Sequence, residues 1–305
     1  MKNLIEQNVS KDLLDKVDQY VKENPVKKEY IDRIPNPKFE YYGKEVWEKA
    51  ITAILNQENI LLVGSKATGK NILAENLAKL FQRPTWNVSF NVNTDSSNLI
   101  GTDTFRNGKV ELRKGPIYLA AENGGFGILD EINMARNDAS AVLHATLDYR
   151  RIIDVPGYDK IELDKNTRFI GTMNYGYIGT RELNEALTSR FMVIKVPTIK
   201  KNNLVKLLKE SYPNLKEEAS LQFAEMFYDI NTKNENGEIS SNSVELRGLI
   251  SSIGLIEKGL DPIKAFEMGI IDKSFDDYER VIVKDTVLSR FPLEIVKKDL
   301  FNEWK

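Results

Sequence analysis

The feature that most constrains the fold is a loop with two glycines and a lysine, Gly64-Ser65-Lys66-Ala67-Thr68-Gly69-Lys70-Asn71. A short apolar run, Ile60 to Val63, precedes it, and a helix-like segment, Ile72 to Phe81, follows it. The spacing Gly-x-x-x-x-Gly-Lys between a strand and a helix is typical of a loop that holds nucleotide phosphates. Its glycines let successive backbone N–H groups turn toward anionic oxygens, and the helix adds its positive dipole end. The sequence therefore predicts a phosphate site in which Lys70 supplies a cation.

One position in this loop departs from the usual pattern. The residue after the lysine is normally Ser or Thr, whose hydroxyl binds Mg²⁺, and here it is Asn71. A carboxamide oxygen can also bind Mg²⁺, directly or through water, but its side chain is longer. We expect nucleotide binding to survive and hydrolysis to be slow or altered in metal preference. The residues expected to bind nucleotide are Gly64, Ser65, Ala67, Thr68, Gly69, Lys70 and Asn71.

The composition excludes several other kinds of site. The chain has 305 residues and no cysteine, so thiolate metal sites, thiol catalysis and disulfides are excluded. Its single histidine, His144, makes a histidine-built metal site unexpected, and we expect that residue to be structural. Lys+Arg 43 against Asp+Glu 45 argues against a general polyanion binder. No apolar run approaches the ~20 residues of a membrane span, so we expect a cytoplasmic protein.

Two adjacent acids follow a second apolar run. Asp130 and Glu131 end the predicted strand Phe126 to Leu129. If that strand is central in a parallel sheet, its carboxyl end opens into the same crevice as the phosphate loop. Asp130 would then hold Mg²⁺, and Glu131 would polarise an attacking water as a general base.

Three further polar residues are candidates for chemistry. Asn174 ends the predicted strand from residue 168 to 173 and could position the attacking water; its alternative is a turn residue. Arg190 leads into the strand that begins at Phe191, where it could pair locally or act as an arginine finger on a neighbouring subunit. Arg247 is a weaker candidate because arginine is common on exposed helix faces.

The chain is predicted to have three parts. Residues 1–40 form an N-terminal helical extension, residues 41–197 an α/β core with a parallel sheet, and residues 198–305 a small all-helical domain with a C-terminal tail. The core alternates helices with strands, and hairpins are expected at 104–112 and 151–163. In the helical part we expect helices around 204–208, 221–227 and 246–256, with a polar loop from Asn231 to Asn242.

Three runs together resemble the MoxR-type AAA+ ATPases, in the subgroup with the CbbQ, NirQ and NorQ proteins and the dynein-related AAA family. The runs are Lys114-Gly115-Pro116 through Gly127-Ile128-Leu129-Asp130-Glu131-Ile132-Asn133, then Gly171-Thr172-Met173-Asn174, then Gly179 through Arg190-Phe191. The resemblance covers about residues 42 to 270. It implies an AAA+ P-loop core followed by a helical lid.

The resemblance also implies roles for individual residues. Gly64 to Asn71 would be Walker A, Asp130 and Glu131 the Walker B acids, and Asn174 sensor 1. Arg190 matches the arginine-finger position and Arg247 the sensor-2 arginine of the lid. The two hairpins match inserts that lie near the central pore of a ring in this family. Its members are ring-shaped, usually hexameric, ATP-driven chaperones that often work with a partner carrying a von Willebrand factor A domain.

The sequence thus favours an ATPase that uses ATP and Mg²⁺ and remodels a partner protein as a ring-shaped homo-oligomer. A second interpretation is a nucleotide-gated switch that assembles with ATP but barely hydrolyses it, which Asn71 motivates. A third is a nucleic-acid-directed motor, which the near-neutral charge makes less attractive because such proteins carry basic surfaces.

Overall fold

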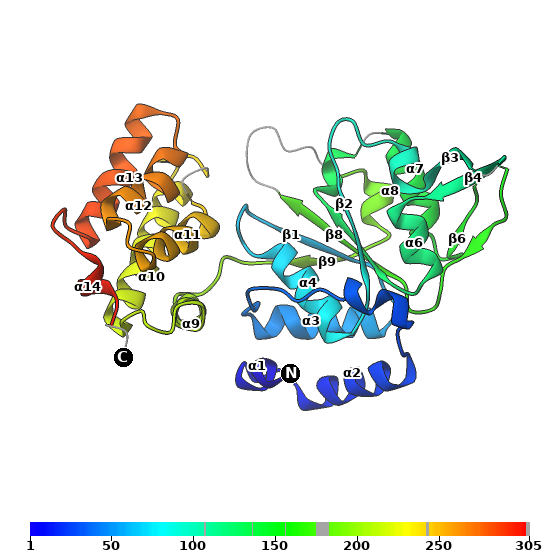
Figure 1. Cartoon of the computed structure of the whole chain (residues 1–305), viewed down its shortest axis with the longest axis horizontal. Helices are drawn as coiled ribbons and strands as arrows, with labels where there is room; N and C mark the ends of the chain where they lie inside the picture. Colours follow the sequence, from blue (N-terminus) through cyan, green and yellow to red (C-terminus); the bar gives the residue numbers. More distant parts are fainter. Residues whose placement is uncertain (107, 136, 156, 175–182, 242–243, 303–305) are drawn as a thin grey trace. The chain divides into compact units, whose positions relative to one another are not determined.

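A computed structural model of the chain describes residues 1–106, 108–135, 137–155, 157–174, 183–241 and 244–302 (Figure 1). The chain divides into two compact units, one made of Met1–Ser65 and Gly69–Pro197, the other of Lys66–Thr68 and Thr198–Lys305. The predicted motif residues Gly179 to Glu182 lie outside the described residues.

A five-stranded parallel sheet forms the centre of the first unit. Its strand order is β2-β5-β8-β1-β9, and every neighbouring pair is parallel. The predicted strands are therefore confirmed, with β1 and β5 separated by β8. The bounds are β1 Ile60–Gly64, β2 Thr85–Ser89, β5 Phe126–Asp130, β8 Arg168–Asn174 and β9 Met192–Lys195.

Helices cover both faces of this sheet, which explains why its central strands are continuous apolar runs. Ile60 and Leu62 of β1 belong to one buried cluster, with residues of α3 (Lys44–Leu55) and α4 (Lys70–Leu80). Leu61 and Val63 belong to a second buried cluster, with α6 (Pro116–Glu122) and α7 (Asn137–Thr146). Alternate side chains of β1 therefore pack into two hydrophobic cores, one on each face of the sheet. The α/β fold class is confirmed.

The N-terminal residues pack on the first unit. Helices α1 (Lys2–Glu6) and α2 (Lys11–Glu23) add Leu4, Leu14 and Val17 to the cluster around α3, and the 3-10 helix η1 (Lys28–Arg33) follows them. The Gln7 side chain donates to the Tyr41 carbonyl and accepts from the Gly43 backbone N–H. These backbone contacts fix the direction in which the chain enters the core.

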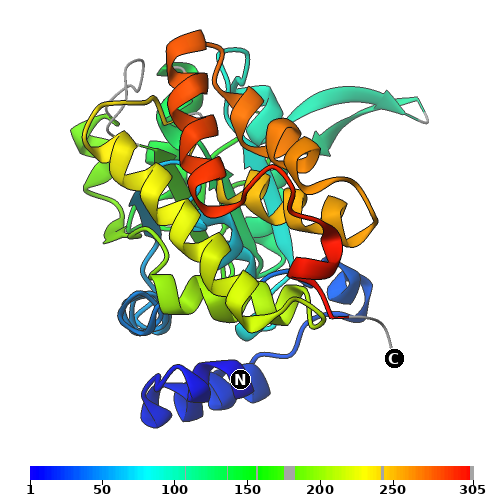
Figure 2. The same cartoon turned by 90° about the vertical axis from the view of Figure 1, so that its left-hand side faces the viewer.

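Two antiparallel hairpins are confirmed, and one is longer than expected. β3 (Gly101–Arg106) and β4 (Lys109–Lys114) form the first, which extends away from the sheet (Figure 2). β6 (Ile152–Ile153) and β7 (Ile161–Glu162) form the second. The predicted turn residues Asn107 and Pro156 lie outside the described residues. Shorter helical segments complete the unit: α5 Ser96–Leu99, η2 Ile132–Met134 and α8 Glu185–Thr188.

Helices build the second unit. Its core holds Phe223, Phe266 and Phe291, whose ring centroids lie 4.7 to 5.9 Å apart. The predicted polar loop from Asn231 is wrong at its start, because α10 continues to Glu235. Asn231 donates to Glu235 one turn later, and the first glycine comes at 237. The helices are α9 Lys201–Ser211, α10 Glu217–Glu235, α11 Leu246–Glu257, α12 Pro262–Gly269, η3 Ile271–Lys273, α13 Asp277–Arg290 and α14 Lys297–Leu300.

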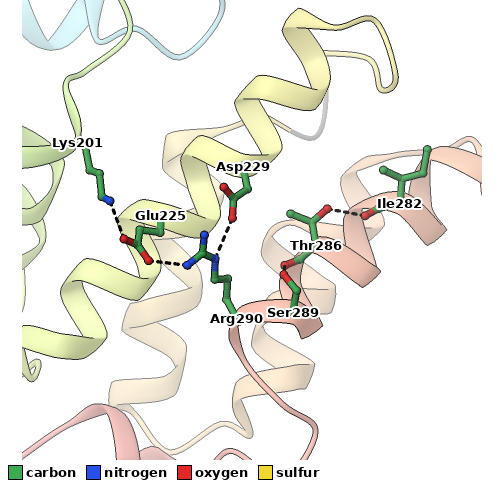
Figure 3. Close-up of polar contacts among 7 residues, drawn as sticks. All are labelled: Lys201, Glu225, Asp229, Ile282, Thr286, Ser289 and Arg290. Atoms are coloured by element: carbon green, nitrogen blue, oxygen red, sulfur yellow. Dashed lines mark hydrogen bonds and ion pairs between the residues drawn. The ribbon is translucent and has the colours of Figure 1, made fainter.

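A chain of ion pairs joins three of these helices (Figure 3). Glu225 of α10 forms two ion pairs. Its Oε1 lies 2.7 Å from Lys201 Nζ of α9, and its Oε2 lies 2.6 Å from Arg290 Nη1 of α13. Arg290 also contacts Asp229 of α10 at 2.9 Å through its Nε. A hydrogen bond from Lys201 lowers the pKa of Glu225, with burial opposing it. The network links the ends of α9 and α13 to one face of α10.

Replacing Arg290 with alanine should destabilise the protein by roughly 1 kcal/mol, because Glu225 and Asp229 both lose a cation at a partly exposed site. Thermal unfolding measures this, with the exposed Lys284 on the same helix, changed to alanine, as control. Because the pKa of Glu225 is lowered, its share of the stabilisation is present above its ordinary pKa of 4.5 and is lost as pH falls further. Equal midpoints for both variants would refute a stabilising role.

Candidate functional site

The loop between β1 and α4 has the backbone of an anion-binding turn. Gly69 adopts a left-handed conformation (φ 84°) as the residue that precedes α4, and Ala67 has a φ of 62°. Glycine adopts such a φ freely, whereas alanine in this region is strained. Alternation of right- and left-handed residues turns successive N–H groups toward one point, at the N-terminus of an eleven-residue helix. The loop therefore fits the phosphates that its sequence predicts.

Lys70 lies against the loop rather than in solvent. Its Nζ donates to the carbonyls of Gly64 (3.1 Å) and Ser65 (2.7 Å), and the residue is 7% exposed. Burial lowers its pKa to about 8, while the charges of Asp130 and Glu131 oppose this shift. A desolvated cation beside the backbone N–H groups at the start of α4 is a site that an anion would complete.

The Asp130 carboxylate is held on both oxygens. Oδ1 accepts from the Thr172 hydroxyl at 2.5 Å, and Oδ2 accepts from the Asn71 amide at 2.9 Å. The nitrogen of Asn71 thus faces the carboxylate, and its oxygen points elsewhere. A metal would have to displace this amide from Asp130 or bind beside it. Asp130 and the Asn71 oxygen are hard oxygen donors of the kind that Mg²⁺ takes, together with phosphate and water.

Glu131 leaves the strand in a left-handed conformation with a φ of 54°, which exposes its side chain. Its backbone N–H donates to the Thr172 hydroxyl at 3.3 Å, and its Oε1 lies 3.4 Å from the Asn174 amide nitrogen. Asn174 is paired in register with Gly64 across β8 and β1. The structure thus brings together the loop, both acids and Asn174 at the carboxyl ends of three adjacent strands.

Thr172 is the residue of this cluster that sequence reasoning missed. It is 1% exposed, and its hydroxyl bridges Asp130 to the backbone of Glu131. The signal available in the sequence was a hydroxyl inside an otherwise apolar strand, two residues before Asn174. Only the pairing of β5 with β8 shows that this hydroxyl meets the acids.

Arg190 is not brought together with the loop. It precedes β9, whose first residue pairs with Ile60 at the amino end of β1, whereas the loop follows the carboxyl end. Its Nη1 donates to the Ala186 carbonyl, and its Nη2 lies 3.6 Å from Asp148 Oδ2. Partial burial and the charge of Arg190 lower the pKa of His144, which places that histidine in the same neighbourhood.

Arg247 is the second residue of α11 in the second unit, and its side chain is exposed. Its predicted role in nucleotide contact stays a prediction. No helix among the described residues is long and apolar enough to cross a bilayer. In the same part of the chain, no cluster of three or more His, Cys, Asp or Glu side chains is arranged to hold a metal.

Comparison with known proteins gives a family and relatives of similar length. Residues 59–191 match the AAA domain (dynein-related subfamily). The uncharacterized protein YojN of Bacillus subtilis (strain 168) is 33% identical over 276 residues, which is 88% of this chain and 90% of YojN. The uncharacterized protein SAOUHSC_01413 of Staphylococcus aureus (strain NCTC 8325 / PS 47) is 32% identical over 241 residues, 77% of this chain and 91% of that protein. The crystal structure of a "putative ATPase" from Cytophaga hutchinsonii ATCC 33406 superposes with a TM-score of 0.45 at 22% identity, over 71% of this chain and 66% of that one.

Proposed function

Because this chain, which is related to YojN, belongs to the AAA-type ATPases by its match to the AAA domain (dynein-related subfamily), we propose that it hydrolyses Mg-ATP as a ring-forming motor that remodels a partner protein. The observation that carries the proposal is the meeting of Lys70, Asp130, Glu131 and Asn174 at the ends of β1, β5 and β8. In this proposal Lys70 is the cation that binds the phosphates, Asp130 a metal ligand, Glu131 the general base and Asn174 the amide that positions the water.

Each residue has a defined task in this proposal. The loop N–H groups and Lys70 bind the phosphates, and Asp130 with Asn71 would hold Mg²⁺, which neutralises charge on them. Glu131 accepts a proton from the attacking water, and the Asn174 amide keeps that carboxylate and the water aligned. Thr172 fixes the directions of both acids through its hydroxyl.

The position of Arg190 supports action between copies of the chain. Within one chain it lies toward the amino ends of the strands and away from the loop, so an arginine-finger role requires the nucleotide of a neighbouring copy. We therefore propose a closed homo-oligomer, a hexamer by likeness to the MoxR-type proteins. Arg247 would act as the lid arginine, and the partner would carry a von Willebrand factor A domain.

A nucleotide-gated switch with slow hydrolysis is the second candidate, and one contact favours it. The Asn71 amide donates to Asp130, so the metal ligand is already engaged by a neighbour that is longer than the usual hydroxyl. Such a protein would bind ATP and assemble, and its turnover would be limited by metal entry.

Changing Asn71 to threonine should raise the ATP turnover rate and lower the Mg²⁺ concentration needed for half-maximal activity. The shorter hydroxyl frees Asp130 Oδ2 and restores the usual ligand geometry. Phosphate release measured across a Mg²⁺ series tests this, with the partly buried Glu75, four residues later in α4, changed to glutamine as control. A variant with the wild-type rate and Mg²⁺ dependence would show that Asn71 limits neither step.

The proposed function is tested by phosphate release from Mg-ATP together with light scattering in the presence and absence of ATP. We expect turnover above the background of Glu131→Gln, and a nucleotide-dependent increase in mass. Turnover no faster than that variant, with assembly intact, would favour the switch. Absence of both would refute the proposal.

A further inference from the structure

One carboxylate outside the phosphate site holds two arginines. Asp148 lies in the segment that links α7 to β6. Its Oδ1 accepts from Arg150 Nε at 2.7 Å and from the Arg150 backbone N–H at 3.1 Å. Its Oδ2 lies 3.6 Å from Arg190 Nη2. Two guanidinium groups from different parts of the chain are therefore gathered on opposite oxygens of one side chain.

The cluster of Asp148, Arg150 and Arg190 has a net positive charge and contains guanidinium N–H groups that make no hydrogen bond within the described residues. Hydrogen bonds from Arg150 lower the pKa of Asp148, so the carboxylate is ionised and carries one negative charge against two positive ones. Within the described residues, the Nε of Arg190 is buried without a hydrogen-bond partner. Arg150 is bound through Nε, which leaves its two terminal nitrogens with no partner in the described part of the chain. The two terminal nitrogens of the exposed Arg150 form a guanidinium edge that matches two oxygens of a phosphate.

The exposure of the three side chains fits a pair of arginines that faces solvent with the carboxylate behind it. Asp148 is 12% exposed, Arg190 is 28% exposed and Arg150 is 66% exposed. The carboxylate thus lies beneath the arginines, and Arg150 extends furthest into solvent. Without Asp148, the two cations would repel each other and Arg190 would lose the only ion pair it makes among the described residues.

The anion that this pair fits does not come from the same chain, because Arg190 lies at the end of the sheet opposite the phosphate loop. We propose that Arg150 acts with Arg190 on the terminal phosphate of ATP bound to a neighbouring copy, and that Asp148 is the positioning residue for both. This inference rests on the proposed function, which supplies both the ATP and the neighbouring copy. The alternative is that Asp148 and Arg150 only stabilise the turn after α7.

The first measurement separates turnover from binding. Arg150→Ala should lower kcat about tenfold or more, since it removes one cation from the transition state, and leave ATP affinity within about twofold. Arg150→Lys should not restore kcat, because an ammonium group cannot bind two phosphate oxygens in the bidentate geometry of a guanidinium group. Asp148→Asn should lower kcat and Asp148→Glu should recover part of it. The exposed Lys165→Ala is the matched control, and thermal midpoints confirm that each variant folds.

The second measurement tests action between copies. Lys70→Ala chains keep both arginines but lack the phosphate lysine, whereas Arg150→Ala chains keep a complete nucleotide loop. Mixed oligomers should hydrolyse ATP severalfold faster than the sum of the two variants alone. Absence of recovery in co-assembled, folded chains would overturn the role in trans. A wild-type rate in Arg150→Ala would overturn this inference alone, whereas a wild-type protein that hydrolyses no ATP would overturn the proposed function and this inference with it.

Discussion

Alanine at position 70 should lower ATP affinity by roughly two orders of magnitude or more, which corresponds to the 2–5 kcal/mol typical of truncating one partner of a buried charge pair. Lys70 is the cation of the loop, it is almost fully buried, and its ammonium donates to the carbonyls of Gly64 and Ser65. Calorimetric titration with ATP measures the loss. Lys79→Ala, at the other end of the same helix, should bind ATP as the wild type does.

The same variant should fold without loss of stability. Because burial lowers the pKa of Lys70 to about 8, the folded protein without nucleotide disfavours the charged lysine. That cost is present at neutral pH and declines as pH rises from 8 toward the ordinary value of 10.5. We expect Lys70→Ala to unfold at a temperature equal to or above that of the wild type and to lose affinity for ATP. A lower midpoint with unchanged affinity would show that Lys70 is structural.

Glutamine at position 131 should leave ATP binding intact and reduce hydrolysis by about 10²- to 10⁴-fold, the usual contribution of a general base. The amide has the shape of the carboxylate but cannot accept a proton from water. The backbone that presents this side chain is held by Thr172 and is not altered by the change. Single-turnover hydrolysis measures the chemical step directly.

Two observations would check that the effect comes from chemistry. Glu45→Gln, on the exposed face of α3, should hydrolyse ATP at the wild-type rate. The Glu131→Gln protein should remain assembled with ATP for longer than the wild type, because it cannot leave the ATP state. Hydrolysis at the wild-type rate by Glu131→Gln would assign the base to another residue.

Most of the first unit was predictable because its signals are local. Ile60 to Val63 is buried on both faces, and the two glycines that follow it permit the turn into α4. The Asp130-Glu131 pair and Asn174 were each placed at a strand end, and parallel strands bring such ends together. The left-handed backbone at Ala67 was not predictable, since alanine seldom adopts it and only the completed loop imposes it.

The second unit was predicted less well, for a physical reason. Polar residues do not end a helix unless they supply a cap or a breaker, and the run from Asn231 contains neither before Gly237. Helix α12 has only eight residues and gains its stability from contacts such as the Phe223–Phe266–Phe291 cluster. The Glu225–Arg290 link joins residues 65 positions apart, which no local pattern shows.

The sequence by itself determined the turn between β1 and α4, the strands and the identity of the acids and the amide, because these depend on residue type and short spacing. Tertiary structure alone decided which groups meet. It brought the Thr172 hydroxyl onto Asp130, aimed the Asn71 amide at the same carboxylate, and gathered Arg150 and Arg190 on Asp148. The Thr172–Asp130, Asn71–Asp130 and Arg190–Asp148 contacts join residues 42 to 59 positions apart, so they exist only when strand order and helix packing have fixed both partners. Arg150, by contrast, lies two residues from Asp148 and meets it locally.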